Sequence, residues 1–177
     1  MILSTGPVAC ALLTLALLLA SPMSACDLGT GSPFKPERRK FVAHTKRDLP
    51  ERLPAPSVTV KRIIRGSAVP GSSCEDAGLV DLTLSLPDSS GYSLSEVGFY
   101  FRVVSGDEPD LIFPSIPIAG PVVERTMEIS FPWLDGHPRS QKPLDLRVEV
   151  FAVAHDLSIG PPTEFSVQAP VGVSSNP

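Results

Sequence analysis

Hydrophobic and polar residues alternate with a period of two in six stretches between residues 57 and 170. The stretches are SVTVKRII at 57–64, LVDLTLSL at 79–86, VGFYFRV at 97–103, MEISFPW at 127–133, LDLRVEVFA at 144–152 and FSV at 165–167. Successive side chains of a β-strand point to opposite faces, so each stretch predicts a half-buried strand with one apolar face. Phe99, Phe101 and Trp133 fall on the apolar phase, and we expect them in the core.

A seventh apolar stretch, LIFPSIPI at 111–118, is interrupted by Pro114 and Pro117. Proline cannot donate to a strand ladder, so this piece is expected at a sheet edge or in a loop. Clusters rich in Gly, Pro, Ser and Asp separate the stretches, and no helix of ten residues is visible at 57–170. The pattern predicts an all-β fold, a single antiparallel β-sandwich of about seven strands at 57–170, followed by a flexible tail at 171–177. A closed barrel is the alternative, but the long proline-rich connections favour the sandwich.

The start of the chain has a different pattern, an uncharged apolar run at residues 8–20. Its 13 residues are too few to cross a hydrocarbon core, which needs about 20. The run and the small residues after it are typical of a signal peptide, predicted here at 1–25. A buried N-terminal helix is the alternative, but the run has no polar stripe, which a surface helix would need.

Between this run and the first alternating stretch, residues 26–56 combine prolines and basic residues with few apolar positions. That composition predicts a Pro-rich basic linker. Residues 27–57 hold seven Lys and Arg against four Asp and Glu, whereas residues 58–177 hold eight against fifteen. Because an acidic domain repels phosphate backbones, no nucleic acid is expected as a partner.

The sequence MSAC at 23–26 resembles the lipobox of bacterial lipoproteins, in which an aliphatic residue and two small residues precede an invariant cysteine. Met23 stands where the family usually has leucine. The resemblance implies cleavage before Cys26, a diacylglyceryl thioether on its sulfur and, in many bacteria, an acyl chain such as palmitate on its new amino group. Two or three such chains hold a protein firmly at a membrane. The mature chain is therefore expected in the bacterial cell envelope, lipid-anchored to a membrane and exposed outside the cytoplasm.

The three cysteines have different fates under this interpretation. Cys10 leaves with the signal peptide, and a lipidated Cys26 leaves Cys74 as a lone thiol. An unmodified Cys26 could instead form a disulfide with Cys74. The carboxylates of Glu75 and Asp76 disfavour a thiolate at Cys74, which makes it a poor nucleophile.

The last two predicted strands, with the sequence LDLRVEVFAVAHDLSIGPPTEFSV at 144–167, resemble the end of a fibronectin type III domain. The alternating run of Val148, Val150 and Ala152 is followed by a loop that ends in Gly160-Pro161. Leu146 stands where that family usually has a core tyrosine. The resemblance implies a fibronectin type III-like or immunoglobulin-like sandwich.

Motifs that carry chemistry are missing from the sequence. His44 lies in the predicted linker, His137 and His155 lie in loops, and none forms an H-x-H or H-E-x-x-H pair. There is no G-x-S-x-G elbow and no phosphate-binding glycine loop. Metal binding needs ligands that converge at a fixed geometry. We therefore expect a protein that is not an enzyme and uses no cofactor and no metal.

The expected function is a non-catalytic binding or assembly module whose partner is another envelope protein. Sandwiches bind through loops or by adding a partner strand to a sheet edge. The 111–118 stretch is the candidate edge. Tyr100, on the face of its strand opposite the apolar phase, and Tyr92, in a turn, could also contact a partner. The candidate contact residues are Leu111, Ile112, Phe113, Ile116, Tyr92 and Tyr100. The alternative is a secreted carbohydrate-binding accessory domain built on Tyr92, Tyr100 and Trp133, and burial of Trp133 would count against it.

Overall fold

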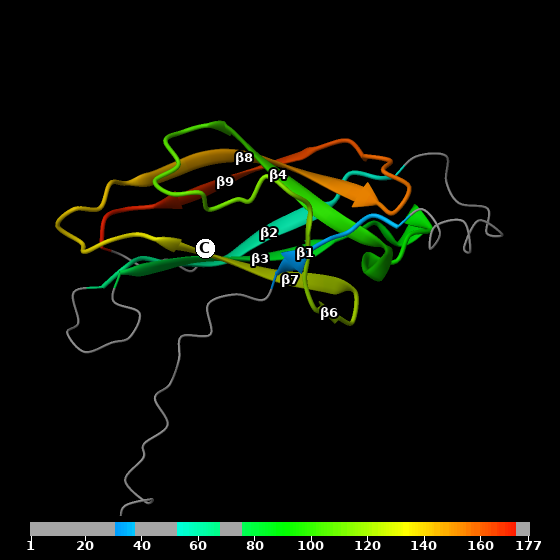
Figure 1. Cartoon of the computed structure of the whole chain (residues 1–177), viewed down its shortest axis with the longest axis horizontal. Helices are drawn as coiled ribbons and strands as arrows, with labels where there is room; N and C mark the ends of the chain where they lie inside the picture. Colours follow the sequence, from blue (N-terminus) through cyan, green and yellow to red (C-terminus); the bar gives the residue numbers. More distant parts are fainter. Residues whose placement is uncertain (1–30, 38–52, 68–75, 173–177) are drawn as a thin grey trace, which may run out of the picture.

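The computed structural model describes residues 31–37, 53–67 and 76–172, and these residues form two β-sheets (Figure 1). The strands are β1 (Ser32–Pro33), β2 (Ser57–Ile64), β3 (Ala77–Ser85), β4 (Val97–Ser105), β5 (Ile118–Ala119), β6 (Val122–Val123), β7 (Thr126–Leu134), β8 (Leu144–Ala154) and β9 (Thr163–Ala169). Two single-turn 3-10 helices, η2 (Asp88–Ser90) and η3 (Leu94–Glu96), connect β3 to β4.

The topology is that of a two-layer sandwich. One sheet has the order β1-β5-β4-β8-β9 and the other the order β2-β3-β7-β6, and neighbouring strands are antiparallel. The orders β2-β3-β7-β6 and β4-β8-β9 correspond to the ABED and CFG sheets of immunoglobulin-type sandwiches. The predicted antiparallel β-sandwich is confirmed, and the barrel alternative is wrong because the two sheets are separate layers (Figure 1).

The six long strands coincide with the six alternating stretches, because alternation places one set of side chains between the sheets. In β7, Met127, Ile129, Phe131 and Trp133 are buried while the residues between them are half-buried or exposed. Strand β3 alternates in the same way across from β7. The core therefore consists of the inward faces of both sheets, as the period of two predicts.

An aromatic cluster closes one part of this core. The Phe101 ring from β4 stacks on Phe113 with the ring centroids 5.4 Å apart, and it meets Phe131 of β7 edge-on at 4.9 Å. Phe165 of β9 joins them at 6.4 Å. Edge-to-face and offset contacts at these separations are the favourable ones for aromatic rings. Phe113 therefore belongs to the core and holds the 105–117 connection against it.

The region predicted as a linker contacts the sandwich on both sides of its undescribed middle. Residues 31–37 lie along the sheet edge at β5, and Leu53 is only 2% exposed within the core. This differs from a free spacer over 26–56, because the apolar side chains of Phe34 and Leu53 contact the sandwich. The predicted signal peptide, Cys26, His44 and Cys74 lie outside the described residues. Within the described part of the chain, no helix is long and apolar enough to span a membrane.

Candidate functional site

The residues predicted to contact a partner are not brought together in the structure. Leu111 and Ile116 are 68% and 46% exposed, but Ile112 and Phe113 are buried in the core. The Glu108 carboxylate accepts a hydrogen bond from the Phe113 backbone N–H at 2.9 Å and helps to fix this connection. Ile112 and Phe113 are therefore unsuitable as contact residues, because both side chains pack into the core.

The predicted edge at 111–118 is also different in the structure. Only Ile118 of this stretch belongs to a strand, and β5 is paired on both sides. Ile118 faces Phe99 of β4 on one side and Pro33 of β1 on the other. The backbone at this edge is thus already covered by the chain's own amino-terminal segment.

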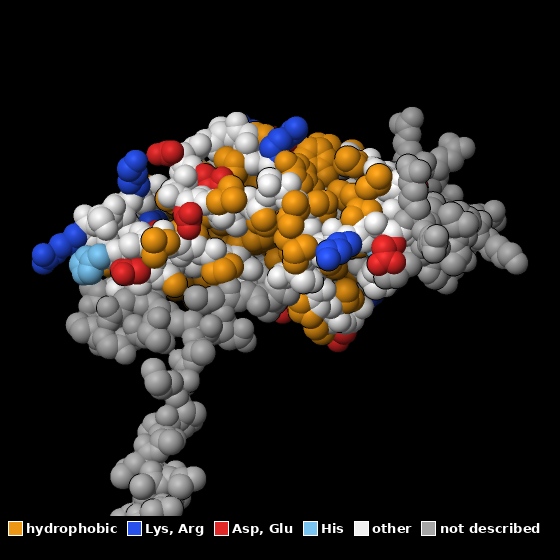
Figure 2. Space-filling view, viewed as in Figure 1, with side chains coloured by type: hydrophobic (Ala, Val, Ile, Leu, Met, Phe, Trp, Pro, Cys, Tyr) orange, Lys and Arg blue, Asp and Glu red, His pale blue; other side chains and the backbone are white. Residues whose placement is uncertain are grey.

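A different edge is open, at β6. This strand ends the sheet β2-β3-β7-β6, and its Val122 and Val123 side chains are 42% and 56% exposed. Val123 pairs with Thr126 across the turn, so the alternation of an antiparallel ladder directs the backbone groups of Val122 away from β7. Figure 2 shows hydrophobic side chains at the position of β6 on the lower rim of the molecule. Strand β6 therefore offers both apolar side chains and backbone hydrogen-bonding groups to a partner.

A groove of about 220 Å³ adjoins this edge and contains one of the predicted tyrosines. Its lining residues come from the β3–β4 connection and from the β6 hairpin: Leu86, Pro87, Asp88, Tyr92, Ser93, Leu94, Val122, Glu124 and Arg125. An ion pair between Arg125 and Asp88 joins the two walls. Burial raises the pKa of the Tyr92 hydroxyl, and the carboxylates of Asp156 and Glu96 add to the shift. The hydroxyl is therefore a neutral hydrogen-bonding group at physiological pH.

Local hydrogen bonds fix the wall that carries Tyr92. The helix η3 begins with a capping box, in which the Glu96 carboxylate accepts the Ser93 backbone N–H at 3.0 Å. The Ser93 hydroxyl accepts the Ser95 backbone N–H at 3.3 Å. Such caps stabilise a helix start by about 1 kcal/mol. The groove is therefore built on an ordered connection.

Tyr100 lies elsewhere, on the outer face of β4. Its ring is 6.2 Å from that of Phe151 on β8, and the Arg102 guanidinium lies 5.1 Å from the Phe151 ring centroid. The two predicted tyrosines thus belong to different surfaces. The Tyr100 face has cross-strand pairs that stabilise the sheet, and only the Tyr92 surface adjoins an open edge.

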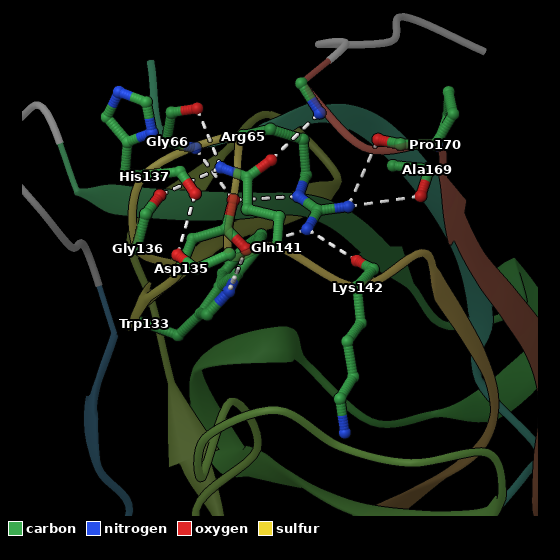
Figure 3. A network of polar contacts seen from close by, with 12 residues as sticks. Arg65, Gly66, Trp133, Asp135, Gly136, His137, Gln141, Lys142, Ala169 and Pro170 are labelled. Carbon is green, nitrogen blue, oxygen red and sulfur yellow. Dashed lines mark hydrogen bonds and ion pairs between the residues drawn. The ribbon is translucent and has the colours of Figure 1, made fainter. Parts of the chain in front are cut away.

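A buried polar network at one end of the sandwich is the other notable cluster (Figure 3). The Arg65 guanidinium, 3% exposed, forms an ion pair with Asp135 at 2.8 Å. Its remaining donors reach the backbone carbonyls of Lys142, Ala169 and Pro170. All five N–H donors that a guanidinium carries are thus directed at groups of the chain itself.

The carboxylate of the network is equally occupied. Asp135 also accepts hydrogen bonds from the Gly66 backbone N–H at 2.7 Å and from the Trp133 indole at 3.2 Å. The Gln141 side-chain amide donates to the carbonyls of Gly66 and Gly136 beside it (Figure 3). The network ties together the ends of β2, β7 and β9, and we assign it a structural role.

Metal binding and a tryptophan platform gain no support. The described residues contain no group of three or more His, Cys, Asp or Glu side chains that could hold a metal ion. Trp133 is 4% exposed and packs over Gly78, where a Cβ atom would lie 2.3 Å from the indole. A buried indole cannot stack on a sugar, which counts against the carbohydrate-binding alternative.

Comparison of the chain with protein-family models, with curated proteins and with solved structures finds no match. The resemblances to a lipobox and to a fibronectin type III domain therefore stay predictions. The β6 edge and its groove are the best candidate site on the geometry alone.

Proposed function

We propose that this chain is a lipid-anchored protein of the bacterial cell envelope whose sandwich is a non-catalytic protein-binding module. The lipobox-like MSAC at 23–26 supports the anchor, and the immunoglobulin-type strand order supports a binding module. Fold alone does not define function. The proposal therefore depends on the site.

The observation that carries the proposal is the position of the groove directly beside the open β6 edge. A partner segment in extended conformation would add to β6 through the backbone groups of Val122. One of its side chains would enter the groove next to Tyr92. In strand addition, backbone hydrogen bonds give affinity and side-chain pockets give specificity.

The size of the groove favours a peptide over a small ligand. Sites for drug-sized molecules enclose about 300–1,000 Å³, whereas this groove measures about 220 Å³. That volume suits one side chain of a bound segment. The lining combines the charged Asp88, Glu124 and Arg125 with apolar side chains such as Leu86 and Leu94, a mixture found at protein interfaces.

The edge is tested with Val122→Asp, which places a charge at the open strand, and with Val104→Asp as the matched control. The two valines are almost equally exposed, at 42% and 44%, and Val104 lies on β4 in the other sheet. Pull-downs from envelope membranes with the native chain and both variants compare the captured proteins. A partner should be retained by the native chain and by Val104→Asp and lost with Val122→Asp. Equal capture by Val122→Asp would refute binding at β6.

The anchor is tested separately by metabolic labelling with a fatty-acid probe in cells that produce the native chain or Cys26→Ser. Label is expected on the native chain alone, because the acyl groups attach to the Cys26 residue. Equal labelling of both chains, or none on either, contradicts lipidation at this position.

A further inference from the structure

The amino-terminal segment Gly31–Glu37, here called the arm, is bound to the sandwich by backbone contacts. Its Ser32 and Pro33 form β1 and pair with β5. The Phe34 backbone N–H donates to the Pro117 carbonyl at 2.8 Å, and the Glu37 backbone N–H donates to Nδ1 of His155 at 3.0 Å. The arm is thus held along its length, from the β5 edge to the end of β8.

Side-chain fit adds to these bonds. A Cβ atom at Gly98 would lie 2.4 Å from Cγ of Phe34, so the glycine leaves the space that the ring fills. The other side of the ring faces His155, with the ring centroids 4.8 Å apart. A Cβ atom at Gly31 would lie 2.6 Å from Ile118 and 3.0 Å from Ile129, so the arm enters where only glycine fits. The surface of the sandwich is therefore shaped to receive the arm.

Docking of the arm determines how far the sandwich can be from Cys26. Five Cα–Cα steps separate Cys26 from Gly31, and they span at most about 18 Å in any conformation. If the arm were released, the tether would run to Leu53 over 27 steps. Such a tether would reach about 97 Å when fully extended and about 30 Å on average as a coil.

We propose that the arm is a clamp that holds the sandwich at the surface of a lipid bilayer, with the β5 and β6 side nearest the anchor. This inference rests on the proposed lipid anchor at Cys26. Gly31 lies against Ile129, and Met127 on the same strand pairs with Val122. Strand spacings then put Val122 about 12 Å from Gly31, and so within about 30 Å of Cys26.

The clamp restricts which partners can reach the β6 edge. A segment bound at Val122 must come from a protein whose chain lies within about 30 Å of the bilayer. While the arm is docked, a partner whose binding segment stays farther than about 30 Å from the bilayer is therefore out of reach.

Energy transfer from a dye at position 123 to a lipid dye tests the clamp in the full-length lipidated chain. The chain is reconstituted in phosphatidylcholine vesicles that carry the acceptor lipid. Phe34→Asp should release the arm and lower the transfer efficiency, because the average length of the tether rises from about 12 Å over five steps to about 30 Å over 27 steps. Gly98→Val changes the sandwich instead of the arm, because its side chain would occupy the space of the Phe34 ring. This variant should also release the arm and lower the transfer efficiency. The matched control, Leu134→Asp, changes a side chain that is 70% exposed and outside the arm contacts, and should leave transfer unchanged.

Hydrogen exchange in the same samples reports whether the arm is docked. The Phe34 and Glu37 amides should be protected in the native chain and exchange rapidly in Phe34→Asp. Unprotected amides in the native chain would overturn the proposal, as would unchanged transfer in a variant whose arm amides exchange freely. Co-flotation with vesicles, compared between the native chain and Cys26→Ser, tests the lipid anchor separately from the clamp. If the native chain does not float with the vesicles, both the anchor and the clamp are refuted. If it floats but Phe34→Asp leaves the energy transfer unchanged, only the clamp is refuted.

Discussion

Replacing Asp135 with alanine is expected to destabilise the domain by about 3–5 kcal/mol, because the Arg65 guanidinium then stays buried without its counter-charge. The two side chains are 2% and 1% exposed, and Arg65 Nε lies 2.8 Å from Asp135 Oδ2. The same carboxylate accepts hydrogen bonds from the Gly66 N–H and the Trp133 indole, and each such bond contributes about 1 kcal/mol. The expected loss therefore belongs at the upper end of the range.

Urea unfolding followed by far-ultraviolet circular dichroism measures this loss. With a slope of about 2 kcal/mol per molar urea, a loss of about 5 kcal/mol lowers the midpoint by about 2.5 M. Arg62→Ala is the control, since its pair with Asp81 has side chains 50% and 18% exposed and should contribute at most about 1 kcal/mol. A midpoint for Asp135→Ala no lower than that of Arg62→Ala would refute the role assigned to the network.

Three other predictions concern the loop, the core and the arm. The backbone N–H groups of Leu134 and Leu111 lower the pKa of the Asp110 carboxyl, so its stabilising effect is present above the unfolded-state pKa and lost as pH falls through the lower folded-state pKa. The protection factor of the Leu134 amide, which compares its exchange rate with the intrinsic rate at the same pH, should therefore fall on acidification, and in Asp110→Asn this fall should be absent. Trp133, the single tryptophan, is 4% exposed, so iodide should leave its fluorescence unquenched until the domain unfolds; quenching in the native state would contradict its burial. Gly98→Val should speed exchange of the Phe34 amide while β7 amides keep their protection, and an unchanged Phe34 amide would contradict the fit of ring and glycine.

The long strands could be predicted from the sequence because each one has two chemically distinct faces. In β7 the buried side chains of Met127, Ile129, Phe131 and Trp133 follow one another at every second position. Such a period fixes both the strand and the face that turns inward. The 111–118 stretch lacks it, since Ile112 and Phe113 are neighbours and are both buried. It was predicted to lie at a sheet edge or in a loop, and of its residues only Ile118 belongs to a strand.

The buried network was missed, although the sequence contains a signal for it. Asp135 continues the inward phase of Phe131 and Trp133, and Arg65 continues that of Ile63. Opposite charges on the inward phases of two strands are expected to meet, because an unpaired buried charge is costly. The pairing itself depends on which strand ends lie together, and that information is in the topology rather than in either stretch.

The candidate site could not be predicted because its elements are too short to have a period. Strand β6 has two residues, Val122 and Val123, and β1 has Ser32 and Pro33. Two residues are too few to show the alternation that predicts a strand. Tyr92 was identified from its place in a predicted turn, but the groove around it forms only when the β3–β4 connection meets the β6 hairpin.

The edges of the two sheets show why β6 is the candidate for binding. An open edge is a liability, because its backbone groups can pair with any exposed strand. Here β1 covers β5, and the edge strands β2 and β9 contact each other on the opposite side of the sandwich. Strand β6 is kept short and is followed by the charged turn residues Glu124 and Arg125, which limits unselective pairing. An edge that is short, flanked by charges and set beside a side-chain groove favours one extended segment over general aggregation, which is the property that a specific strand-addition site requires.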